Sequence, residues 1–247
     1  MFTLRKIMKV FAHRGFSGKY PENTMLAFEK AVEVKADGIE LDVHCTKDGK
    51  LVIIHDEKLE RTSGKPGVVS DYTLSEITAI EANLTHPECH GTTIPSFDEY
   101  CSYIRDKEIV TNVEIKTNLY YYADIEGKLL QALKHWNIED KVIISSFNWL
   151  SVARFKKLAP HITCGLLLER QHMIDVAVLA KEMGIEYYHP DIGIIDDEDV
   201  ACCKKNGIGI NCWTVNTPEQ MKKLIEWDAD GAIGNFPDMA LKALSRA

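Results

Sequence analysis

The strongest constraint on the fold is a repeated alternation of short apolar runs with amphipathic segments of helical length. Eight runs have the length and composition of strands: 10–12, 38–43, 109–115, 141–145, 163–168, 185–188, 208–213 and 230–233. Helix-length segments lie between or after most of them, near 23–34, 124–136, 149–158, 173–183, 196–205, 218–227 and 237–245. Strands that alternate with helices pair in parallel through right-handed crossovers.

Eight such units in 247 residues most economically close into an α/β fold, the TIM (β/α)8 barrel. A doubly wound open sheet is the alternative, but no glycine-rich phosphate loop follows the first strand. We therefore predict one TIM barrel domain over residues 1–247.

The regular spacing is interrupted once, between the second and third predicted strands. We predict a small insertion there, at about 57–107, that covers the top of the barrel and is not a separate domain. It follows a hairpin, because Asp48-Gly49 between alternating residues is typical of a two-residue turn. Short helices are predicted within it, over 74–80 and 96–107.

Composition excludes several classes of partner and location. With 29 Lys and Arg against 37 Asp and Glu, the formal charge of −8 argues against nucleic acid or an anionic membrane as the main partner. The seven cysteines show no C-x-x-C spacing, which is typical of reduced thiols. We find neither a signal peptide nor an apolar run long enough to span a membrane. We expect a cytoplasmic protein, monomeric or homodimeric.

Two acidic residues of the second strand share one face. Glu40 and Asp42 are two apart, so their Cα atoms are roughly 6.5–7 Å from each other. If the hairpin has a two-residue loop, Lys47 pairs with Lys50 and Asp42 lies directly opposite His55. We expect His44 to lie on the opposite face, outside any site. The alternative is a Glu-x-Asp pair that faces solvent.

Polar residues also end the first and third strands. The carboxyl ends of parallel barrel strands open onto one face, where catalytic groups gather. The predicted cluster therefore consists of His13, Arg14, Glu40, Asp42, His55, Glu114 and Lys116.

These residue types favour one class of reaction. Three carboxylates suit Mg²⁺ or Ca²⁺, and the histidines are too few to favour zinc. Two histidines can exchange protons near neutral pH, and an arginine with a lysine can hold phosphate oxygens. Together they indicate metal-assisted phosphoryl transfer or phosphodiester cleavage.

The motifs resemble those of the glycerophosphodiester phosphodiesterases, and they follow the order of that family from residue 13 to about 238. They are His13-Arg14-Gly15, Pro21-Glu22-Asn23-Thr24, Glu40-Leu41-Asp42-Val43, His55-Asp56, Glu114-Ile115-Lys116 and Trp213-Thr214-Val215-Asn216. The family fold is a TIM barrel with an insertion between its second and third strands. Its activity is hydrolysis of glycerophosphodiesters to glycerol 3-phosphate and an alcohol.

The resemblance implies a role for each matched residue. Glu40, Asp42 and Glu114 would hold the divalent metal ion, Mg²⁺ or Ca²⁺, and His13 and His55 would be the acid–base pair. The residues implied to bind substrate are Arg14, Glu22, Asn23, Lys116 and Trp213. Asn23 is equally suited to cap the following helix, and Trp213 to fill the barrel core. Gly234-Asn235 departs from the Thr-Asp common in the family.

Several alternatives stay open. Attack by the substrate's 2-hydroxyl would give a cyclic phosphate, whereas attack by water would not, and either histidine could be the first base. A lysophospholipase D-type phosphodiesterase could use the same site, provided that apolar surface for an acyl chain lies near it. A non-catalytic phosphate- or sugar-binding barrel is the third possibility, but it should lack at least one of the metal ligands or catalytic histidines, and all are present.

Overall fold

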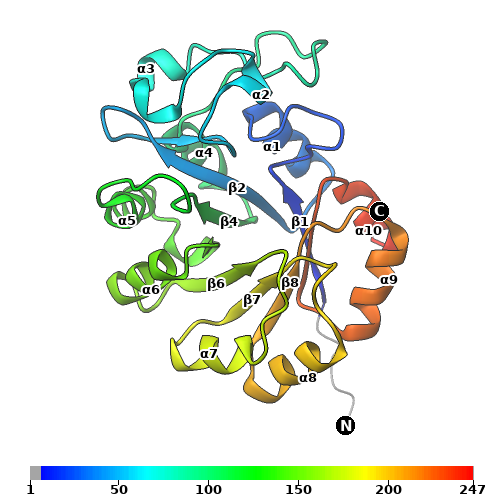
Figure 1. Ribbon diagram of the computed structural model, residues 1–247. Helices are drawn as coiled ribbons and strands as arrows, with labels where there is room; N and C mark the ends of the chain where they lie inside the picture. Colours follow the sequence, from blue (N-terminus) through cyan, green and yellow to red (C-terminus); the bar gives the residue numbers. More distant parts are fainter. Residues whose placement is uncertain (1–6, 247) are drawn as a thin grey trace.

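Eight parallel strands close into a barrel in the computed structural model of the protein, which describes residues 7–246 (Figure 1). The strands are β1 (Lys9–His13), β2 (Gly38–Cys45), β4 (Val110–Ile115), β5 (Val142–Ser146), β6 (Thr163–Leu168), β7 (Tyr187–Pro190), β8 (Gly209–Cys212) and β9 (Gly231–Gly234). The barrel closes because β1 pairs with both β2 and β9. This confirms the predicted TIM barrel and excludes the open sheet.

Helices surround the barrel on its outside (Figure 1). They are α1 (Met25–Glu33), α4 (Phe97–Ile104), α5 (Ile125–Trp136), α6 (Trp149–Leu158), α7 (Val176–Glu182), α8 (Asp197–Asn206), α9 (Pro218–Trp227) and α10 (Pro237–Ala243). The N-cap of α1 is Thr24, whose side chain accepts a hydrogen bond from the Ala27 amide. The interpretation of Asn23 as that cap is therefore wrong.

Strand alternation separates the core from the functional face. In β2, the side chains of Ile39, Leu41 and Val43 belong to the large hydrophobic core that also includes helix residues. The intervening Glu40 and Asp42 are on the other face, toward the barrel axis, because successive side chains of a strand point to opposite sides. A small apolar cluster of Phe11, Ile143 and Ile233 packs separately from that core.

An insertion between β2 and β4 contains β3 (Leu51–Ile53), α2 (Glu60–Ser63), the 3-10 helix η1 (Val69–Asp71) and α3 (Leu74–Ile77), and it precedes α4. It occupies the upper part of Figure 1, in light blue and cyan. It has its own small hydrophobic core, formed by Val52, Ile54, Leu59, Val69, Ile77, Ala82 and Ile94.

The predicted register of the β2–β3 hairpin is wrong by one residue. Val43 pairs with Ile53 and Cys45 with Leu51, so the turn has three residues, and the Gly49 amide bonds the Thr46 carbonyl at 2.9 Å. Gly49 has a φ of 73°, in the left-handed region. A turn that ends in such a residue adds one position to the loop. Asp42 therefore does not lie opposite His55.

None of the helices described between residues 7 and 246 is long and apolar enough to cross a membrane. The seven cysteines are free, and five of them are buried. The stretch for which we predict no signal peptide begins outside the described residues.

Candidate functional site

A cavity of about 570 Å³ opens at the carboxyl ends of the strands. Strands β1, β2 and β4 and the chain after β3 contribute charged and polar lining: His13, Arg14, Glu40, His55, Asn112, Glu114 and Lys116. Glu169 and Arg170 line the cavity just after β6, and Phe147, Leu167, Trp213 and Ile233 are apolar lining residues. The cavity thus offers both charged and apolar side chains, which suits a ligand that carries both phosphate and carbon groups.

The three predicted metal ligands lie together. Carboxylate oxygens of Glu40, Asp42 and Glu114 are all within 4.8 Å of one another, and each residue is less than a tenth exposed. Burial, together with the neighbouring Asp42 and Glu114, raises the pKa of Glu40 well above its usual range. Like charges held this close in a buried site repel unless a cation lies between them.

The donor set fits a divalent cation. Asp42 Oδ1 is buried without a hydrogen-bond partner, and Lys116 Nζ is 3.6 Å from it. Burial alone would raise the pKa of Asp42, but His55, Lys116 and Arg14 together hold it well below its usual range. Asp42 is therefore ionised at neutral pH. An ionised, unshared carboxylate oxygen beside two further carboxylates is the hard donor set that Mg²⁺ and Ca²⁺ prefer.

Two cations flank the carboxylates. Arg14 donates from Nη1 to Glu22 Oε1 at 2.9 Å, and its Nε is buried with no hydrogen-bond partner. Lys116 Nζ lies 2.8 Å from Glu114 Oε1. Although burial lowers the pKa of Lys116, the Glu114 and Asp42 carboxylates raise it above its ordinary value. Both side chains are therefore charged and can bind phosphate oxygens.

Each of the two histidines uses Nδ1 for a structural hydrogen bond. His13 Nδ1 donates to Asn235 Oδ1 at 2.7 Å, and His55 Nδ1 is 2.5 Å from Asp56 Oδ1. Their Nε2 atoms lie among the charged groups, that of His13 3.9 Å from Glu40 Oε2. Burial, and then the neighbouring Arg14, lowers the pKa of His13 to about 3. Neutral His13 therefore presents Nε2 as a proton acceptor.

The remaining predicted residues have different places. Glu22 and Asn23 are not part of the cavity lining; Glu22 holds Arg14, and Asn23 donates to Asp42 Oδ2 at 2.8 Å. Trp213 does line the cavity. Its ring packs edge-on against Phe147, with centroids 5.3 Å apart, and its Nε1 donates to the His189 carbonyl at 2.9 Å. Glu22 and Asn23 therefore contact other site residues, Arg14 and Asp42.

His44 does not lie on the opposite face from Asp42, so that part of the prediction is wrong, although His44 is not among the residues that line the cavity. It is fully buried, its Nε2 is 3.1 Å from the His55 carbonyl, and its Nδ1 is 2.9 Å from the Tyr122 hydroxyl. Strand alternation would have indicated this, because residues 42 and 44 are two apart and share a face. His44 therefore supports the segment that carries His55.

Sequence reasoning also missed Asn235, Asp56 and Arg61 as partners of site residues. Arg61 bonds both Glu22 and Asp56. His55-Asp56 is one of the motifs that resemble the family, but the sequence alone does not indicate which residue binds the aspartate. No pattern in the sequence predicts the position of Arg61, because the helix that carries it has only four residues.

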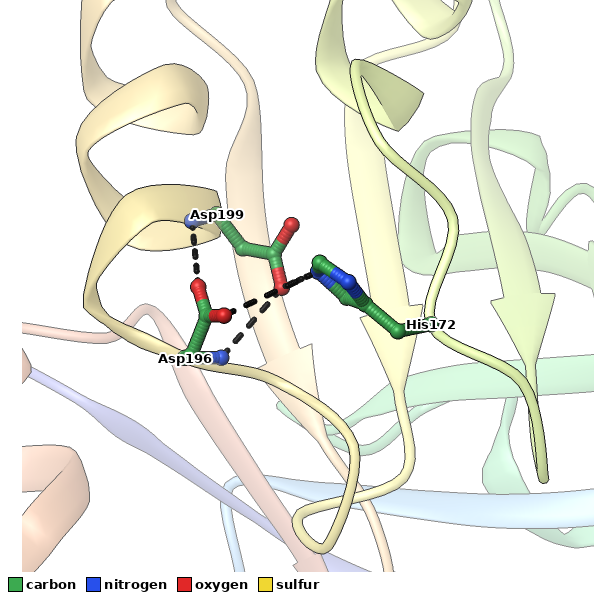
Figure 2. A group of neighbouring side chains, drawn as sticks. All are labelled: His172, Asp196 and Asp199. Carbon is green, nitrogen blue, oxygen red and sulfur yellow. Dashed lines mark hydrogen bonds and ion pairs between the residues drawn. The ribbon is translucent and has the colours of Figure 1, made fainter.

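A second His and Asp cluster lies elsewhere, between the β6–α7 loop and the start of α8 (Figure 2). His172 Nε2 is 2.9 Å from Asp199 Oδ2 and 3.8 Å from Asp196 Oδ2. Asp196 is the N-cap of α8: it accepts the Asp199 amide, and the Asp199 carboxylate accepts the Asp196 amide. Asp199 Oδ2 and Asp196 Oδ1 accept the amides of the helix end, so we interpret the cluster as a capping box joined to a histidine.

Exchange of His172 for alanine is expected to lower the melting temperature more at about pH 5.5 than at about pH 9. The hydrogen bond to Asp199 raises the pKa of His172. Its stabilising effect is therefore complete below the unfolded value of about 6.5 and is lost as pH rises through the folded value. Thermal melts of the wild-type and variant proteins at both pH values test this. A larger difference at the higher pH would contradict it.

Comparisons with known proteins agree with this geometry. The model of the glycerophosphoryl diester phosphodiesterase family matches residues 13–239. A glycerophosphodiester phosphodiesterase of Caldanaerobacter subterraneus subsp. tengcongensis is 42% identical over 238 residues, which cover 96% of this chain and 98% of that protein. One from Bacillus altitudinis is 41% identical over 239 residues, covering 95% and 97% of the two chains. An Oleispira antarctica phosphodiesterase, solved in complex with the product sn-glycerol-3-phosphate, superposes with a TM-score of 0.90 at 26% identity, covering 96% of each chain.

Proposed function

We propose a reaction for this chain, which belongs to the glycerophosphoryl diester phosphodiesterase family. The proposed reaction is hydrolysis of glycerophosphodiesters to glycerol 3-phosphate and an alcohol. The observation that carries this proposal is the meeting of Glu40, Asp42 and Glu114 with two cations and two histidines in one cavity.

The three carboxylates would hold Mg²⁺ or Ca²⁺. When bound, such a cation supplies positive charge that offsets the negative charge of the substrate phosphate. Arg14 Nε has no hydrogen-bond partner, although Asp42 Oδ2 lies 3.6 Å away, and Lys116 is already ionised, so both side chains donate to phosphate oxygens. Carbon atoms of the glycerol or of the alcohol pack against the apolar lining residues Trp213 and Phe147.

Proton transfer falls to the two imidazoles. The Nε2 atom of one histidine accepts the proton of the substrate's 2-hydroxyl, whose oxygen attacks phosphorus, and the other histidine protonates the departing alkoxide. Water then opens the cyclic phosphate with the roles reversed. Direct attack by water is the alternative route. A diester that lacks the neighbouring hydroxyl is inert in the first route and cleaved in the second.

The test of the proposed function is release of glycerol 3-phosphate from glycerophosphocholine, glycerophosphoethanolamine and glycerophosphoinositol, with and without EDTA. We expect release from at least one of them, loss of release in EDTA, and recovery when Mg²⁺ or Ca²⁺ is restored. If no glycerol 3-phosphate is released from any of the three substrates with Mg²⁺ or Ca²⁺ present, the proposed function is wrong.

Changing Asn235 to aspartate is expected to move the pH dependence of kcat/KM. The neutral amide now accepts the proton of His13 Nδ1. A carboxylate there favours the charged imidazole, so the low pKa of His13 rises, by about 1 to 3 units. The limb of the pH profile that His13 controls moves to higher pH by the same amount. An unchanged profile in Asn235→Asp would show that His13 does not titrate in turnover.

A lysophospholipase D-type reaction is a second candidate, favoured by apolar side chains at the mouth of the cavity. Leu119 lines the cavity and is 77% exposed. Phe147 and Leu167 also line the cavity. This surface can contact an acyl chain, and a 1-acyl lysophospholipid keeps the 2-hydroxyl that the first route requires.

The variant Leu119→Ser separates the two substrate classes. If acyl chains bind this surface, choline release from 1-acyl lysophosphatidylcholine falls in the variant, while glycerophosphocholine hydrolysis is unchanged. If lysophosphatidylcholine is not cleaved, or is cleaved equally by both proteins, the surface has no such role.

A further inference from the structure

Arg61 binds two carboxylates that come from different parts of the chain. Its Nη1 and Nη2 donate to Glu22 Oε2 and Oε1 at 2.8 and 2.7 Å. Its Nε and Nη2 donate to Asp56 Oδ2 and Oδ1 at 2.6 and 3.1 Å. One guanidinium thus forms four hydrogen bonds with both carboxylates in a forked geometry, which a lysine cannot reproduce.

The ordinary interpretation is a surface salt bridge, since the Arg61 side chain is 42% exposed. Such pairs contribute little unless they have forked geometry or belong to a network. Here both conditions hold, because each carboxylate has a second partner inside the site. Glu22 binds Arg14 at 2.9 Å, and Asp56 binds His55 at 2.5 Å.

The backbone that carries Arg61 is firmly held. Leu59, two residues earlier, is fully buried in the hydrophobic core of the insertion. Thr62, the next residue, is also buried, and its carbonyl accepts the Leu84 amide at 2.9 Å. The apolar core of the insertion therefore fixes the start of α2, and α2 in turn directs Arg61 over the edge of the site.

We propose that Arg61 is a positioning residue through which the insertion holds the phosphate-binding Arg14 and the proton-transferring His55 in fixed relative places. The role of Arg61 rests on the proposed function, because it acts on two residues of that mechanism. Without it, Glu22 and Asp56 lose their shared partner and repel each other. Arg14 then binds phosphate less well, and His55 loses its orientation, so that both KM and kcat change.

The experiment compares Arg61→Ala with Arg105→Ala, using glycerophosphocholine as substrate. Arg105 is a matched control, because it also lies between β2 and β4, at the end of α4, and its exposed side chain pairs with the exposed Asp106 at 3.5 Å. Misplacement of reacting groups by about 1 Å can cost about 100-fold in rate. We expect kcat/KM of Arg61→Ala to fall by about that factor, with a lower kcat and a higher KM. We expect Arg105→Ala to keep wild-type values.

Variants of the two carboxylate partners of Arg61 separate its effect on kcat from its effect on KM. Asp56→Asn should lower mainly kcat and Glu22→Gln should raise mainly KM. Adding Arg61→Ala to Asp56→Asn should then change mainly KM, and adding it to Glu22→Gln should change mainly kcat. If Arg61→Ala does not fold, Arg61→Lys serves in its place, since one ammonium group cannot hold both carboxylates.

A readout without turnover completes the test. In the wild-type protein the His55 Nδ1 proton, held by Asp56, should give a low-field proton NMR signal that broadens or disappears in the Arg61 variant. A variant with wild-type kcat, KM and NMR signal, whatever its melting temperature, would overturn the role of Arg61. Failure of the wild-type protein to release glycerol 3-phosphate would instead refute the proposed function, and the NMR comparison would still decide whether Arg61 positions His55.

Discussion

Alanine in place of either His13 or His55 is expected to lower kcat by about 10²- to 10⁴-fold, the usual contribution of a positioned proton-transfer group. In each ring Nδ1 forms a hydrogen bond with a side chain, Asn235 or Asp56. The Nε2 atom therefore remains among the charged groups of the site. The loss should occur with little change in cation affinity, because neither imidazole belongs to the carboxylate cluster. Steady-state kinetics and calorimetric titration with Mg²⁺ measure the two effects separately.

The control for these variants is His161→Ala, because His161 is exposed and pairs with Glu139 at 3.1 Å. It should retain wild-type turnover. A diester with a p-nitrophenol leaving group assigns the roles, since that group departs without protonation. The variant that lacks the acid should recover on this substrate, and the variant that lacks the base should not. Near wild-type kcat in both alanine variants would contradict acid–base catalysis by this pair.

Glutamine in place of Glu40 is expected to weaken binding of the divalent cation by at least about 10- to 100-fold and to remove activity at ordinary cation concentrations. Glutamine keeps the shape of the side chain but removes one of the three negative charges that meet within 4.8 Å. The loss of that charge also reduces repulsion in the free protein, so the variant should be no less stable than the wild type without cation. Calorimetric titration with Mg²⁺ and Ca²⁺, and thermal melts in EDTA, test both statements.

Asp196→Asn is the matched control for Glu40→Gln, because it removes one negative charge from the second His and Asp cluster. Cation affinity should be unchanged by this substitution. If both variants lost the same cation affinity, the cation would be binding acidic surfaces in general and not specifically the site in the barrel.

The barrel and the main site could be predicted because both depend on regular geometry. Apolar runs identify the strands, and parallel strands bring the polar residues in and just after β1, β2 and β4 to one mouth. That reasoning requires only the order of elements, so it does not depend on loop conformation. The three carboxylates Glu40, Asp42 and Glu114 therefore meet as predicted.

The details that sequence reasoning missed depend on loops. The hairpin register changes by one residue because the turn has three residues and ends in the left-handed Gly49. The Asp48-Gly49 pair is equally typical of a two-residue turn, so the sequence does not separate the two. Arg61 lies on a helix of four residues, too short for any periodic pattern. Asn235 reaches His13 across 222 positions of sequence. Such contacts depend on how separate loops pack together, and no pattern in a single amino-acid sequence predicts them.

Anomalous diffraction from crystals grown with Mn²⁺, which shares the oxygen ligands of Mg²⁺, tests the central claim most directly. A strong peak should lie at about 2.0–2.2 Å from carboxylate oxygens of Glu40, Asp42 and Glu114, with the Nε2 atoms of His13 and His55 facing the same cavity. A peak at His172, Asp196 and Asp199 with none at the barrel mouth would contradict the account.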